Sequence, residues 1–275
     1  MKIVFVSIAL LQVLSLTGQF VLMSYNIRYD NSYDTLNSWE KRKTAVVRLM
    51  DFYDADIIGT QEGLSNQVKY MDSCLTDYAC TGVGREDGVQ KGEYCAIFYD
   101  TGRVSLLSGS TFWLSESPEN VSVGWDAALE RICTWGLFEN LETSDRLLVF
   151  NAHLDHQGAL AREKSAELLI AKIGEINTGN YPVVLMGDFN ATPESKPVSI
   201  IKKQMSDGFA ISDEYLNGPL GTFNGFNTDA PVIERIDYIF TSGLDVSIYS
   251  HIDDRMDNRR FISDHFPVLA VVYVK

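Results

Sequence analysis

Carboxylate, amide and imidazole side chains recur in this sequence where apolar, strand-like runs end. The members of this set are, in chain order, Asn26, Glu62, His153, Asp188, Asn190, Asp237, Asp264 and His265. Polar groups held on a rigid scaffold of strands are the material of metal and acid–base sites. Each residue alone also fits a turn or a satisfied core histidine. Only the whole set therefore indicates a site.

Apolar periodicity predicts the elements that must position this set. Residues 39–53 and 158–177 carry apolar side chains at helical spacing and predict two amphipathic helices. Strands are predicted at 20–27, 56–60, 94–99, 104–107, 132–141, 147–152, 182–186, 235–241, 246–249 and 267–274. No Pro/Gly/Ser-rich linker separates them, so we expect one domain with a large β core covered by helices. The pattern alone does not indicate two stacked sheets.

The N-terminus has the pattern of a secretion signal. Lys2 is followed by the apolar stretch Ile3–Leu16, which is too short to span a bilayer well, and then by Thr17-Gly18-Gln19. The competing interpretation is a buried first strand. We predict a signal peptide at 1–19, a catalytic domain at 20–275, and a secreted or periplasmic protein. No other stretch is expected to cross a membrane, and neither a stable membrane anchor nor an obligate protein partner is predicted.

Net charge argues against one class of partner. The formal charge is −14 and the sequence pI is about 4.7, whereas non-specific binding of long nucleic acid depends on clustered Lys and Arg. The basic runs at 41–43 and 259–260 are short. Acidic clusters also hold cations, so the charge is compatible with a metal enzyme.

The four cysteines match no zinc-binding spacing. Cys95 and Cys133 lie in apolar strand-like runs and are expected to be buried thiols. A loop closed by a Cys74–Cys80 disulfide is possible in a secreted protein. His251 belongs to no motif and is expected at the surface.

Six segments together resemble the endonuclease/exonuclease/phosphatase superfamily. They are SYNIR (24–28), QE (61–62), NAHLDH (151–156), GDFN (187–190), RIDYIF (235–240) and SDHFPV (263–268). The resemblance runs from about Phe20 to Lys275. It implies an α/β fold, a four-layer αββα sandwich of two mixed β-sheets packed face to face and covered by helices. The site would lie at the strand ends between the two sheets.

The resemblance also implies roles for the polar set. Glu62 would be the principal ligand of Mg²⁺, with Mn²⁺ possible, and Asn26 and Asp264 would lie beside it as further metal ligands. A hard cation that prefers oxygen ligands relieves the negative charge of a phosphate ester. The expected catalytic residues are His265, Asp237, Asp188, Asn190 and His153.

Within that catalytic group, His265 and Asp237 would form a dyad in which the carboxylate fixes the imidazole. Asp188 and Asn190 would orient the attacking water, and His153 would donate to a phosphoryl oxygen. Whether His265 or Asp188 takes the proton from water stays open.

Three further residues are candidate substrate contacts. Arg131 begins a strand and is expected either to contact phosphate or to form a surface ion pair. His156 extends the His153 motif. Asn224 belongs to a loop that could reach the substrate, and a turn asparagine is the alternative. For the tryptophans 113, 125 and 135, core packing is favoured over a stacking platform.

The sequence thus predicts a metal-dependent hydrolase of phosphate esters, with a phosphodiesterase or nuclease as the leading form. The substrate would be a nucleotide, a short or single-stranded nucleic acid, or a small phosphorylated metabolite. One alternative is a phosphatase or phosphodiesterase acting on phosphorylated sugars, inositols or lipid headgroups. Another is a catalytically silent binding module of the same fold, against which the complete polar set argues.

Overall fold

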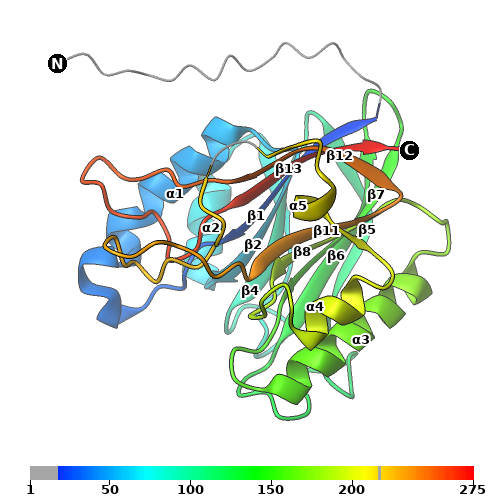
Figure 1. Cartoon of the computed structure of the whole chain (residues 1–275), viewed down its shortest axis with the longest axis horizontal. Helices are drawn as coiled ribbons and strands as arrows, with labels where there is room; N and C mark the ends of the chain where they lie inside the picture. The colour runs from blue at the N-terminus through cyan, green and yellow to red at the C-terminus, as the bar shows by residue number, and fades with distance from the viewer. Residues whose placement is uncertain (1–17, 216–217) are drawn as a thin grey trace.

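The computed structural model describes residues 18–215 and 218–275. Two β-sheets are packed face to face, and helices cover both outer faces (Figure 1). The four-layer αββα sandwich expected from the resemblance is therefore confirmed. The predicted signal peptide falls almost wholly in residues 1–17, outside the described residues. The first strand begins at Gln19, which pairs with Tyr273, one residue before the predicted domain start.

The first sheet has the strand order β10-β12-β13-β1-β2-β4-β3. Its strands are β1 Gln19–Asn26, β2 Ile57–Gly63, β3 Tyr78–Thr81, β4 Tyr94–Asp100, β10 Glu214–Tyr215, β12 Leu244–His251 and β13 Val268–Val274. The sheet is mixed, because β1 pairs with β2 in parallel and with β13 antiparallel. The 3₁₀ helix η1 Ser32–Asn37 and the helices α1 Trp39–Tyr53 and α2 Ser65–Cys74 belong to this half.

The second sheet has the order β5-β6-β7-β8-β11-β9. Its strands are β5 Val104–Trp113, β6 Ile132–Asn140, β7 Arg146–His153, β8 Val183–Asp188, β9 Ser206–Asp207 and β11 Asp237–Ser242. Only β7 and β8 run parallel among its pairs. Helices α3 Ala159–Ile176 and α4 Lys196–Ile201 lie along this half, and the short helix α5 is Gly208–Ile211.

Three apolar layers hold the four structural layers together. Leu22 and Val184 point into the core between the sheets, while their neighbours Met23 and Leu185 point outward toward the helices. Successive side chains of a strand face opposite sides of its sheet. Because both faces of the central strands are covered, these strands are continuously apolar rather than alternating.

The end of one predicted strand and one predicted exposure differ from the structure. The strand expected at 104–107 extends as β5 to Trp113, through the polar run Ser108–Thr111 that the apolar pattern did not reveal. His251 was wrongly expected at the surface. Its side chain is 1% exposed, and its ring stacks on Phe209. The predicted burial of Cys95 and Cys133 is confirmed, and Cys74 and Cys80 are free thiols.

The buried imidazole of His251 makes stability depend on pH. Burial, assisted by Arg235, lowers the pKa of His251 to about 4, although the Pro219 carbonyl, Asp237 and Asp207 act in the opposite direction. The unfolded chain keeps a pKa near 6.5, so between pH 6.5 and 4 it binds a proton that the folded chain rejects. The free energy of unfolding is therefore undiminished by this residue above pH 6.5, and it falls as the pH drops from 6.5 to 4.

We expect protonation of His251 in the unfolded chain to lower the free energy of unfolding by about 2 kcal/mol between pH 7 and pH 5. Urea unfolding of the wild type and of His251→Phe at both pH values isolates that term, because the carboxylates common to both proteins cancel. An equal pH dependence in the two proteins would contradict the prediction.

Candidate active site

The predicted polar set gathers at one edge of the sandwich. Asn26 ends β1 and His153 ends β7, while Asp188 ends β8 directly opposite Asp237, the first residue of β11. His153 is also in register with Asp188 across the parallel pair β7–β8. Because parallel strands end at the same sheet edge, both sheets present their polar residues to a shared space. A pocket of about 580 Å³ lies there.

Glu62 is held in a fixed orientation at the end of β2. Its backbone has φ 66°, in the left-handed region that non-glycine residues seldom adopt. Oε1 accepts from Asn26 Nδ2 at 3.0 Å, and Oε2 accepts from the Tyr29 backbone N–H at 3.1 Å. Each carboxylate oxygen retains lone pairs, so the hydrogen bonds orient the Glu62 carboxylate and still leave it able to bind a cation.

Asn26 bridges the two sheets. Besides Glu62, its Nδ2 donates to Asp188 Oδ2 at 2.9 Å, and its Oδ1 accepts from the Arg28 backbone N–H. With this amide orientation, which follows from the hydrogen-bond partners, the N–H₂ group faces the carboxylates. Asn26 thus positions Glu62 and Asp188 relative to one another, and its role as a metal ligand stays a prediction.

His265 and Asp237 form the predicted dyad. His265 Nδ1 lies 2.9 Å from Asp237 Oδ2, and Nε2 points toward Asp188 Oδ2 at 3.8 Å. Burial opposes the imidazolium, but the nearby carboxylates, chiefly Asp237 and Asp188, outweigh it and raise the pKa of His265 well above its ordinary value. The dyad therefore favours the protonated form of His265 and directs Nε2 at a second carboxyl group.

Several carboxyl groups share this buried space. Burial and the charge of Asp237 raise the pKa of Asp188 to about 7, despite the opposing effect of His265. Burial is also the main cause that raises the pKa of Asp264 to about 6 and of Glu93 to about 7, with Glu62 adding to both. Crowded carboxylates of this kind carry a negative potential that a cation would relieve.

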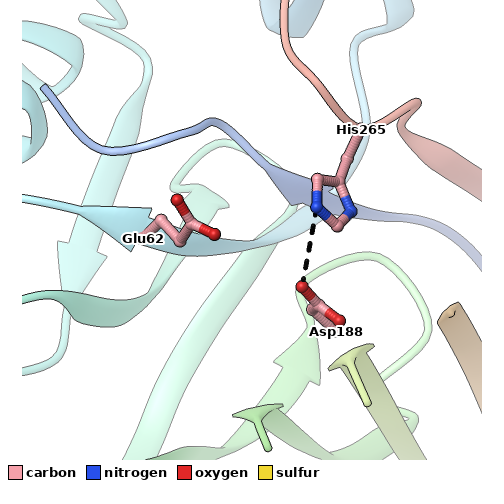
Figure 2. A group of neighbouring side chains, drawn as sticks. All are labelled: Glu62, Asp188 and His265. Atoms are coloured by element: carbon pink, nitrogen blue, oxygen red, sulfur yellow. Dashed lines mark ion pairs between the residues drawn. The ribbon is translucent and has the colours of Figure 1, made fainter. Parts of the chain in front are cut away.

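Glu62, Asp188 and His265 each offer a ligand atom, and these atoms lie within 4.8 Å of one another. Figure 2 shows the three side chains converging from separate segments of the chain. The donor set fits a divalent cation, since two carboxylates supply the oxygen ligands that Mg²⁺ and Mn²⁺ prefer. Asp264 lies beside this group, where Arg28 Nη1 is 3.6 Å from its Oδ2 and 4.0 Å from Glu62 Oε2.

His153 and Asn190 meet on the other side of the pocket. Asn190 Nδ2 and Arg131 Nη1 lie 3.2 and 3.1 Å from His153 Nε2. Both are donors, so Nε2 acts as the acceptor and the ring proton is on Nδ1. Burial and the neighbouring arginines lower the pKa of His153 well below its ordinary value. The predicted donation from His153 to a phosphoryl oxygen stays a prediction.

Arg131 is a buried pocket residue rather than part of a surface ion pair. Its guanidinium contacts Asp155 at 3.2 Å and His156 Nδ1 at 2.8 Å in addition to His153. Although burial opposes its charge, Asp155 has its pKa lowered to about 2 by the N–H groups of Gly158 and Gln157 and by Arg131. The contact with Asp155 holds the Arg131 guanidinium, and with it His156, at the pocket wall.

We expect Arg131→Lys to raise KM for a phosphate ester about tenfold, because a lysine cannot reproduce the planar fork that reaches three partners at once. Steady-state kinetics with a thermal melt of each protein tests this. A lowered melting temperature with an unchanged KM would instead assign Arg131 a purely structural role.

Asn224 has the turn role that the sequence left as its alternative. Its Nδ2 donates to the Ser263 carbonyl, and its Oδ1 accepts from the Phe226 N–H. The side chain is buried and does not line the pocket, but the adjacent Phe223 does. A backbone hydrogen bond also fixes Asn224, because its N–H donates to the Asp264 carbonyl.

Two arginines near the site were not predicted as site residues. Arg28, with φ 59°, makes a two-point contact with Asp34 and lines the pocket. Arg85 makes a two-point contact with Glu93, whose Oε2 is 3.8 Å from His153 Nδ1. Arg28 stands inside the SYNIR motif, which was a usable signal. Arg85 lies in a loop with no motif, so the sequence held no comparable signal for it.

The comparisons with known proteins agree with this geometry. The sequence profile of the Endonuclease/Exonuclease/phosphatase family matches residues 23–265, and the chain belongs to this family. A family protein from Bacteroides thetaiotaomicron has a solved structure with a TM-score of 0.90 and 36% identity, covering 94% of this chain and 99% of that one.

A mannosyl-6-phosphatase of Bacteroides thetaiotaomicron is also similar. It shares 37% identity with a TM-score of 0.88, over 92% of this chain and 99% of that one. Among curated sequences, an uncharacterised protein of Acanthamoeba polyphaga mimivirus is 24% identical over 88% of this chain and 95% of its own length. The family membership supports phosphoester hydrolysis as the general activity.

Proposed function

We propose that this protein is a divalent-metal-dependent hydrolase that removes phosphate from small phosphorylated molecules. The observation that carries the proposal is the convergence of Glu62, Asp188 and His265 within 4.8 Å at the strand ends. His265 is oriented by Asp237, as a catalytic imidazole requires. A catalytically silent module would have no need to keep buried carboxylates so close together.

Glu62 and Asp188, with Asp264 beside them, would hold Mg²⁺ or Mn²⁺. When bound, the cation would neutralise charge on the phosphate oxygens and orient the ester. Asn26 keeps the two principal carboxylates at a fixed separation through its bridging amide. The site therefore needs little rearrangement to bind a cation.

His265 and Asp188 form the pair that handles the proton of the attacking water. Asp237 holds the ring so that Nε2 faces Asp188, and one member of the pair accepts the proton while the other stabilises the charge that develops. Arg131 lines the opposite wall, and its guanidinium has five N–H groups of which Asp155, His153 and His156 take three, so donors remain there. Donors already in place lower the barrier without reorganisation during the reaction.

The ester class follows from charge and from the similar proteins. The pocket is lined by two arginines, five carboxyl groups and three imidazoles, and the chain has a net charge of −14. A long polyanion gains little from such a surface. The sequence left phosphodiesterase and nuclease activity as the leading form, whereas the similarity to a mannosyl-6-phosphatase now favours a small phosphomonoester.

A substrate panel tests the ester class. The monoesters are sugar phosphates, inositol phosphates and an aryl phosphate, and the assay measures phosphate release. The diesters are bis-p-nitrophenyl phosphate and a short single-stranded DNA, and the assay measures their cleavage. Both classes are compared in Mg²⁺ and in Mn²⁺. We expect turnover of monoesters. Turnover confined to the diesters would replace the proposal with the phosphodiesterase or nuclease form.

We also infer that the protein is exported. The apolar stretch Ile3–Leu16 after Lys2 supports a signal peptide at 1–19, and among the described helices none is long and apolar enough to cross a membrane. The N-terminus of the protein recovered after expression in a bacterial host with an export pathway tests this. An unprocessed Met1 in the cytoplasmic fraction would contradict it.

A further inference from the structure

One wall of the pocket has no role in the chemistry described above. It consists of Phe223, Glu234, Ile236, Ala191 and Thr192. The backbone N–H of Phe223 donates to the Glu234 carbonyl at 3.1 Å, and the Phe189 N–H donates to the Ile236 carbonyl at 2.8 Å. The wall is therefore one continuous surface, made of two hydrogen-bonded segments and the loop that follows β8.

Phe223 is an exposed aromatic ring at the reaction centre. Its side chain remains 38% exposed, and its ring centroid lies 5.0 Å from that of His265 in an edge-on arrangement. The adjoining Thr222 is fully buried and receives Ile236 N–H and Asp237 N–H on its hydroxyl, so the backbone below the ring is fixed. An aromatic surface held beside a catalytic histidine is suited to stacking against a ligand.

Glu234 adds a carboxylate to the same wall. In the part of the chain that the structure describes, its side chain makes no ion pair or hydrogen bond, and it is exposed. The two arginines that line the pocket each have an acidic partner, Asp34 for Arg28 and Asp155 for Arg131. A second phosphate at this wall would meet a carboxylate without a compensating cation, whereas a hydroxyl group would find an acceptor.

We propose that this wall binds the leaving group of the substrate, and that the leaving group is a neutral polyhydroxylated ring of the sugar type. The C–H face of the ring would stack on Phe223, and its hydroxyls would donate to Glu234 and exchange hydrogen bonds with Thr192. Aromatic and carboxylate groups placed side by side match both surfaces of a sugar ring. This inference rests on the proposed phosphatase function and specifies its substrate class.

The test is a selectivity ratio, defined as kcat/KM for mannose 6-phosphate divided by kcat/KM for ethyl phosphate, which has no ring and no hydroxyls. We expect the wild type to prefer the sugar phosphate by at least about tenfold. Phe223→Ala and Glu234→Gln are each expected to lower the ratio about tenfold, as loss of one stacking or charge-assisted contact does. The matched controls Phe52→Ala and Glu142→Gln alter exposed residues far from the pocket and should leave it unchanged.

The outcomes separate this inference from the proposed function. If the wild type hydrolyses ethyl phosphate in a metal-dependent way but shows no preference for the sugar phosphate, the sugar-binding wall is wrong and the phosphatase function stands. An unchanged ratio in both wall variants also overturns the inference. If no phosphomonoester is hydrolysed, the inference fails together with the function on which it rests.

Discussion

Replacing His265 with alanine is expected to lower kcat about a thousandfold with little change in the affinity for metal. The imidazole is the group that Asp237 holds against Asp188, and general acid–base groups typically contribute a hundredfold to ten-thousandfold. Asp237→Asn is expected to give a smaller loss, because the ring remains but its orientation and charge are no longer supported. Single-turnover phosphate release measures the effect without a contribution from product dissociation.

The control for this prediction is a check that each variant is folded. His265 is buried against Phe223, so a thermal melt of each variant must show a cooperative transition above the assay temperature. A folded His265→Ala protein that retains more than about a tenth of the wild-type kcat would contradict the role assigned to the dyad.

Replacing Glu62 with glutamine is expected to weaken Mg²⁺ binding at least about a hundredfold, because the substitution removes a charged oxygen ligand while keeping the size of the side chain. The amide oxygen can accept from only one of the two donors, Asn26 Nδ2 or Tyr29 N–H, so a thermal melt must show that the variant is folded. Isothermal titration with MgCl₂ measures the affinity directly, and kcat/KM at limiting metal should fall in parallel.

Glu142→Gln is the matched control for the Glu62 variant, since Glu142 lies in an exposed turn. Its metal affinity should equal that of the wild type. Equal affinities in the Glu62 and Glu142 variants would show that the cation binds without Glu62, and the ligand set would have to be reassigned.

The elements that apolar periodicity marks were predictable. The helix predicted at 39–53 is α1, and the helix at 158–177 is α3 to within a residue at each end. Continuous burial of both faces made β1 and β8 visible as apolar runs. By contrast, β5 continues through exposed Ser and Gly residues at the edge of its sheet, where pairing with β6 rather than burial defines the strand.

The site was predictable as a set of residues but not as a set of contacts. The motifs located Glu62, Asp188 and His265, which the structure brings together. They did not reveal that the amide of Asn26 faces two carboxylates, because that orientation depends on the Arg28 backbone. Burial of His251 depends likewise on Phe209, 42 positions earlier in the chain, which no local pattern encodes.

We expect this site to hydrolyse phosphate esters with a divalent cation. The most direct test is phosphate release by the wild-type protein before treatment with EDTA, after it, and after Mg²⁺ is restored in excess. We predict release from a phosphomonoester that stops with the chelator and recovers with the metal. Release that continues undiminished in EDTA would contradict the claim, and so would a failure to hydrolyse any phosphate ester with Mg²⁺ or Mn²⁺ present.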